Sequence, residues 1–166
     1  MSALQLQVPS VALEASRLSL LTPNLSSPNR TRPDEDAVRV LLISHHTEDD
    51  ALLRRVLAQP KWLVWTARTL ADGIRLLKQN TFSVAICESE LPDGTWREFL
   101  DRAARLEHGP EVIVASRLAD ESLWAEALNI GAWDVLSKPF SSEEVLHVVG
   151  YAGRRWESQQ PPSVLR

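Results

Sequence analysis

The chain has 166 residues, 44% of them hydrophobic and 24% charged, which is enough apolar material for one domain of ordinary size. Its net charge of -4 at pH 7 provides no general positive field, which argues against direct binding to nucleic acid or to an anionic membrane. The single cysteine, Cys87, excludes an internal disulfide and fits a reducing compartment. Because no stretch approaches the roughly 20 apolar residues of a membrane-spanning helix, and no signal-peptide pattern is present, we expect a cytoplasmic protein.

Polar, proline-containing stretches occupy both ends of the chain. Residues 1–36 hold four of the ten prolines and a run rich in Ser, Asn and Thr. Such a composition buries too little apolar surface to offset the entropy of ordering, so we expect a flexible leader at 1–36, with a short amphipathic segment at 11–21. Residues 157–166 are expected to form a tail without a further output domain. This leaves one globular domain over residues 37–156.

Within this domain, apolar runs alternate with segments of helical periodicity. Repeated βα units indicate a parallel sheet with helices on both faces. We therefore predict an α/β fold, a doubly wound (βα)5 domain built as a three-layer sandwich. In chain order, the expected strand and helix pairs are 38–44 with 48–57, 62–67 with 70–79, 82–87 with 95–106, 111–116 with 121–130, and 133–137 with a last helix from Ser141 or Ser142.

Polar residues stand where these expected strands end. In an open parallel sheet, ligands and reacting groups gather beyond the carboxyl ends of the strands. We therefore expect the functional site at this edge of the sheet. The residues placed there are Ser44 and His45, Glu88, Ser116 and Lys138.

This ordered set resembles the receiver domain of bacterial response regulators. The likeness covers roughly residues 38–156 and implies a CheY-like, flavodoxin-like fold. It also implies a role in two-component or phosphorelay signalling instead of enzymatic catalysis, no cofactor, and a protein partner such as a histidine kinase. The residues that carry the likeness are the turn Leu91-Pro92-Asp93-Gly94, Ser116, Gly131-Ala132 and Lys138-Pro139-Phe140.

The resemblance also shows where this chain departs from the family. Glu88 stands where receivers have their phosphate-accepting aspartate, and Ser44 and His45 stand where they carry the acidic pair that holds Mg²⁺. Mg²⁺ prefers hard oxygen ligands, so we expect the metal site to be lost. The extra carbon of Glu88 displaces its carboxylate by roughly 1.5 Å. We expect Glu88 and Lys138 to form an ion pair that needs no metal, with phosphoryl transfer strongly depressed.

Several roles are open for this pair. Glu88 either reaches toward Ser116 and Lys138 and imitates the phosphorylated state, or it is only a structural staple; weak residual phosphorylation is a third possibility. The family's aromatic switch residue is Val135 here, which argues against the mimic. From another class, the same crevice would suit a ligand-binding or enzymatic flavodoxin-like domain. The absence of a Gly-rich loop after the first strand argues against nucleotide or flavin.

Two further features have competing interpretations. His45 and His46, with Glu88, Glu48 and Asp49, offer ligands for zinc, but we expect no metal and two loop histidines, one exposed and one contacting Glu88. Trp124 and Trp133 map near the face that receivers use for partners and homodimers, and aromatic residues are favoured interface anchors. Local packing is the alternative for both tryptophans.

Overall fold

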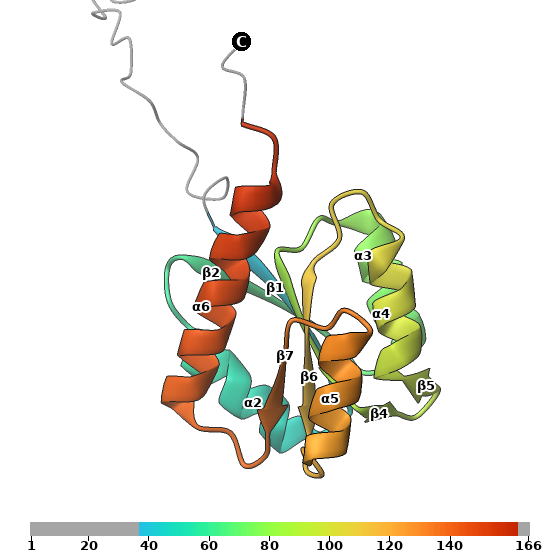
Figure 1. Ribbon diagram of the computed structural model, residues 1–166. Coiled ribbons are helices and arrows are strands. Elements are labelled where there is room, and N and C mark those ends of the chain that lie inside the picture. The colour runs from blue at the N-terminus through green and yellow to red at the C-terminus, as the bar shows by residue number, and fades with distance from the viewer. Residues whose placement is uncertain (1–36, 163–166) are drawn as a thin grey trace, which may run out of the picture. The chain divides into compact units, whose positions relative to one another are not determined.

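Five parallel strands form one sheet in the order β2-β1-β3-β6-β7, which confirms the predicted (βα)5 fold (Figure 1). The computed structural model describes residues 37–162, so the expected leader at 1–36 lies outside the described residues. No helix among the described residues is long and apolar enough to cross a membrane. The strands of the sheet are β1 (Val38–Ile43), β2 (Trp62–Ala67), β3 (Val84–Glu88), β6 (Glu111–Ser116) and β7 (Asp134–Ser137).

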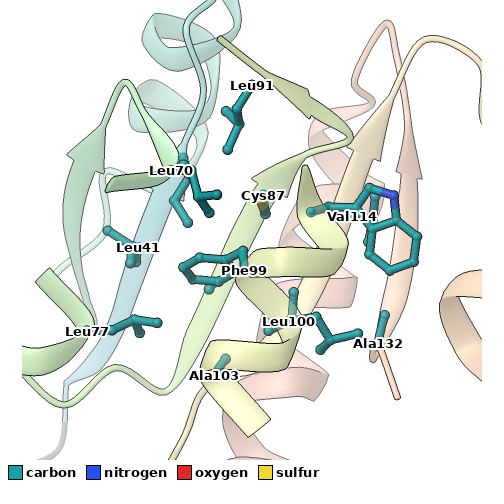
Figure 2. Close-up of a cluster of buried hydrophobic side chains, with 14 of the residues drawn as sticks. Leu41, Leu70, Leu77, Cys87, Leu91, Phe99, Leu100, Ala103, Val114 and Ala132 are labelled. Atoms are coloured by element: carbon teal, nitrogen blue, oxygen red, sulfur yellow. The ribbon is translucent and has the colours of Figure 1, made fainter. Parts of the chain in front are cut away.

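Helices cover both faces of the sheet and divide the core into two clusters (Figure 1). One cluster lies under three helices and includes Leu41, Phe99 and Val114; ten of its side chains are labelled in Figure 2. The other cluster lies under the remaining two helices and includes Leu42, Ile113 and Val149. The helices over the first cluster are α3 (Leu70–Gln79), α4 (Trp96–Ala104) and α5 (Glu121–Asn129). Those over the second cluster are α2 (Thr47–Val56) and α6 (Ser142–Gln159).

The central strand β3 is buried along its whole length, which is why it reads as a continuous apolar run in the sequence. Cys87 has no exposed surface, and burial raises the pKa of its thiol, so the protonated and unreactive form is favoured. The strand ends on Glu88 itself, one residue later than expected from the sequence. The site residue is therefore held by sheet hydrogen bonds and not by a loop.

Two local features differ from the expectations. A short hairpin, β4 (Glu90–Leu91) with β5 (Gly94–Thr95), forms around the expected turn. Helix α6 continues to Gln159, so the boundary expected at 157 was placed too early. Its last turns are anchored because Trp156 Nε1 donates to the Gly109 carbonyl at 2.9 Å and Gln159 Nε2 donates to Glu111 at 3.2 Å.

Asp93, at the tip of the hairpin, fixes the start of α3. Its two carboxylate oxygens accept hydrogen bonds from the backbone N–H groups of Leu70, at 2.7 Å, and Ala71, at 2.9 Å. The first N–H groups of a helix have no partner within the helix, and a carboxylate there is favoured by the helix dipole. These bonds hold the pKa of Asp93 below its usual range.

We therefore predict that Asp93→Ala lowers the free energy of unfolding in a pH-dependent way. A lowered folded-state pKa contributes stability above the unfolded value of about 3.9, and this contribution is lost as the pH falls through the folded-state pKa. Urea unfolding between pH 7 and pH 3 should show a difference from wild type that is full near neutrality and shrinks in acid. The control Glu90→Ala, in the same hairpin, should leave stability at pH 7 nearly unchanged. A difference that persists unchanged at low pH would contradict this assignment.

Candidate functional site

The four expected strand-end positions do come together at the carboxyl edge of the sheet. Ser44 follows β1, Glu88 ends β3, Ser116 ends β6 and Lys138 follows β7. All four are buried, with exposed fractions of 9% for Ser44, 6% for Glu88, 4% for Ser116 and 9% for Lys138. Buried polar groups of this kind are costly unless they are paired, so their partners determine what the site can do.

The centre of the site is the ammonium group of Lys138, which lies between two carboxylates. Its Nζ donates to Glu88 Oε1 and, at 2.7 Å, to Asp49 Oδ2. The other oxygen of Glu88, Oε2, accepts from the Ser44 hydroxyl at 3.3 Å. The expected contact between Glu88 and Lys138 is therefore present, and both carboxylate oxygens of Glu88 are occupied.

Asp49 is the member of the site that sequence reasoning missed. It was considered only as a possible metal ligand, whereas the structure makes it the second partner of Lys138. A signal was available, because Asp49 lies in the first turn of the helix that follows β1 and therefore beside the same edge of the sheet. With two carboxylates and one ammonium, the cluster carries a formal charge of -1 instead of the expected neutral pair. We name Lys138, Glu88 and Asp49 the charged triad.

Ser116 belongs to a separate hydrogen-bond system. Its hydroxyl accepts from Ser89 Oγ at 3.1 Å and from the Leu118 backbone N–H at 3.1 Å. Within residues 37–162, no hydrogen bond joins Ser116 to Glu88. Val135 is 1% exposed and packs in the core cluster under α3, α4 and α5. Neither residue is coupled to the charged triad by a polar contact in this part of the chain.

The two histidines do not form a metal site with their acidic neighbours. Their rings lie against each other, with centroids 3.9 Å apart and planes tilted by 38°. His45 is exposed and His46 half-buried, and neither hydrogen-bonds Glu88 in the described part of the chain, which corrects the expectation that one of them contacts it. Across residues 37–162, no three His, Cys, Asp or Glu side chains are grouped so that they could hold a metal ion.

A cleft of about 570 Å³ opens beside the triad, between α4 and α5. Its lining includes Glu88, Ser89, Ser116 and the two histidines. Arg97 of α4 forms a bidentate ion pair with Glu126 of α5 and so links its two walls. The triad is therefore close to solvent on this side while its charged atoms remain covered.

The two tryptophans singled out from the sequence have different environments. Trp124 of α5 is 37% exposed, and Leu128, one turn later, is 48% exposed. Trp133 is half-buried, packs against the core cluster under α2 and α6, and lies beneath the Arg155 guanidinium at 5.2 Å. The geometry thus favours local packing for Trp133 and leaves Trp124 on an accessible apolar surface.

A family model and a related sequence each match most of the chain. The family model "Response regulator receiver domain" matches residues 33–150. The KDP operon transcriptional regulatory protein KdpE of Escherichia coli (strain K12) is 32% identical over 126 residues, which are 76% of this chain and 56% of that protein. The chain therefore spans little more than half the length of this relative.

Solved structures agree with this fold. The signal receiver domain of a putative Luxo repressor protein from Vibrio parahaemolyticus superposes with a TM-score of 0.70 at 22% identity, covering 74% of this chain and 95% of that one. A CheY-like response regulator receiver domain protein from Methanospirillum hungatei JF-1 gives a TM-score of 0.68 at 22% identity, covering 75% and 99%. At these identities, the likeness shows the fold alone.

We predict that the two partners of the central ion pair are not equally important for stability. Lys138→Met leaves the buried Glu88 and the half-buried Asp49 without a cation and should cost about 3–5 kcal/mol, as expected for breaking a buried pair. Glu88→Gln keeps the bond between Lys138 and Asp49 and should cost less, about 1–3 kcal/mol. Urea unfolding at pH 7 measures both.

Arg54→Met is the matched control, because Arg54 pairs with Asp50 on the surface, where an ion pair is worth at most about 1 kcal/mol. The assignment is contradicted if Lys138→Met is no more harmful than this control.

Proposed function

Because this chain belongs to the response regulator receiver family, we propose that it is a signalling receiver that works without phosphoryl transfer and acts through protein contacts. The observation that carries the proposal is the charged triad, in which the lysine ammonium is already bonded to both nearby carboxylates. On this view the domain is a recognition module and not an enzyme.

The residues at the strand ends do not fit the Mg²⁺ ion that the family implies. Mg²⁺ takes oxygen ligands in a near-octahedral arrangement, usually including carboxylates. Ser44 and His45 supply a hydroxyl and an imidazole at the positions of the acidic pair, and the Ser44 hydroxyl is directed to Glu88. Glu88 and Asp49 are both bonded to Lys138, so the ammonium takes the place beside the carboxylates that a cation would occupy.

The same contacts oppose phosphoryl transfer to Glu88. Transfer depends on an in-line nucleophile and on a cation that neutralises the developing charge. One oxygen of Glu88 is held by Lys138 and the other by Ser44, so a free and aligned carboxylate oxygen is not presented to a donor. The missing metal ligands and the longer side chain of Glu88 both reduce phosphoryl transfer.

Between the phosphate mimic and the structural staple, the contacts of Glu88 support the staple. A phosphate mimic would be expected to engage the hydroxyl of Ser116, but that hydroxyl is bonded to Ser89 and Leu118. Val135, at the place of the aromatic switch residue, is fully packed and has no aromatic ring to reorient. The triad then holds β3, β7 and α2 in one fixed arrangement.

Protein contacts are supported by the apolar surface of α5 and of the loop before it. Leu118 is 81% exposed, and Trp124, Leu128 and Ile130 are each more than one-third exposed. Large exposed apolar side chains that lie close together are typical of interaction surfaces. We propose this surface as the contact site for a signalling partner such as a histidine kinase, and the adjoining face formed by α5, β7 and α6 as a possible homodimer contact.

We predict that the wild-type chain takes up no phosphate from a small-molecule donor. After incubation with acetyl phosphate and Mg²⁺, intact-protein mass spectrometry should show no phosphate adduct on wild type or on Glu88→Gln, because neither offers an aligned nucleophile with a metal. A variant that restores the family pattern, Glu88→Asp with Ser44→Asp and His45→Asp, serves as the positive control and should be labelled. Stoichiometric labelling of wild type that disappears in Glu88→Gln would refute the proposal.

A further inference from the structure

One face of α6 carries a shallow groove of about 340 Å³ that is separate from the charged triad and from the surface of α5. The side chains of this face recur at helical spacing, so they form one stripe along the helix. Lys61, from the turn before β2, lies on the rim of the groove. The α6 stripe consists of Glu143, Leu146, His147, Gly150, Tyr151 and Arg154.

The middle of the α6 stripe is aromatic and open. Tyr151 is 49% exposed, and its ring lies 4.4 Å from that of His147 and 4.3 Å from the Arg154 guanidinium. A Cβ atom added at Gly150 would meet no atom closer than Arg154 Nη1 at 3.7 Å, so the small residue leaves a hollow that the fold itself does not require. An exposed aromatic ring beside such a hollow suits close contact with another backbone.

Charge is divided between the two ends of the stripe. Glu143 lies in the first turn of α6, while Arg154 lies near the other end. Lys61 lines the same groove as Arg154, and its Nζ lies 4.9 Å from the centroid of the Trp62 ring. No ion pair is formed by Glu143, Lys61 or Arg154 with any residue in 37–162. The stripe therefore has an acidic end, an aromatic centre and a basic end.

The α6 stripe is complementary to a second α6 stripe that runs in the opposite direction. Rotation about a point midway between Val148 and Val149 exchanges Glu143 with Arg154, Leu146 with Tyr151, and His147 with Gly150. We propose that a second copy of this chain docks on the α6 stripe, with the two α6 helices antiparallel about a two-fold axis. Such an interface is isologous, because each contact occurs twice.

Each pair in the reversed alignment has a physical role. Glu143 meets the partner's Arg154 at both ends, Tyr151 covers the partner's Leu146, and Gly150 lets the helices approach at the partner's His147. A parallel arrangement would instead place Glu143 against Glu143 of the partner subunit, which is repulsive. This dimer differs from one through α5, β7 and α6. The side of α6 that faces Trp133, just before β7, carries Arg155, and Arg155 is not part of the α6 stripe.

Charge reversal tests the pairing in the full chain by sedimentation equilibrium. Glu143→Arg and Arg154→Glu each turn two attractive contacts into two repulsive ones, and each should raise the dimer Kd about tenfold or more. Mixing the two variants in equal amounts should restore association near the wild-type Kd. In the mixed dimer a guanidinium of one variant faces a carboxylate of the other at both ends of the interface. In a parallel alignment the wild-type charges would repel, so the mixture would bind more tightly than wild type; a mixture that matches the wild-type Kd therefore supports the antiparallel alignment.

Gly150→Leu tests the close approach independently of charge. The side chain enters open space and replaces a glycine in a helix interior, so the melting temperature should be unchanged or higher, while the dimer Kd should rise about tenfold or more. Glu90→Ala, in the β4–β5 hairpin, is the control and should keep the wild-type Kd. The proposal is overturned if wild type stays monomeric at millimolar concentration, if mixing fails to restore association, or if Gly150→Leu leaves the dimer Kd no higher than Glu90→Ala does.

Discussion

The chemistry of this domain depends on one buried ammonium group held between two carboxylates. Removing Lys138 from water costs several kcal/mol, and the cost is offset only because Glu88 and Asp49 both bond to its Nζ. The three residues come from the end of β7, the end of β3 and the first turn of α2, so a single cation fixes three elements at one edge of the sheet. Both carboxylates are thus already bonded to a cation, which is the basis of our proposal that the site takes up no metal ion.

Fold and site are determined by different residues, so the altered centre that we propose is compatible with an intact scaffold. The sheet is held by buried apolar side chains such as Leu41, Ile86 and Ile113, none of which belongs to the charged triad. The charged triad lies beyond the ends of those strands. The replacement of the acidic pair and of the aspartate that we propose would therefore leave the packing of the receiver fold unaffected, and the exposed surfaces of α5 and α6 would remain available for recognition.

Most of the fold could be predicted because buried parallel strands and amphipathic helices give strong periodic signals, as in β3 and α3. The contact between Glu88 and Lys138 followed from the rule that strand ends meet at one edge. Asp49 was missed because its partner is 89 residues away in sequence and nothing local marks a long-range ion pair. The extension of α6 depends on Trp156 bonding to Gly109, and the stacking of His45 on His46 depends on side-chain orientations, so neither was visible in the sequence.

The most direct test of the central claim is a titration of the wild-type chain with Mg²⁺, followed by the backbone amide resonances of Ser44, Asp49 and Glu88. If the ammonium of Lys138 already holds both carboxylates, these resonances should show no saturable shift up to tens of millimolar Mg²⁺. Saturable shifts at millimolar Mg²⁺, centred on the same three residues, would show that a cation enters the triad and would contradict the account.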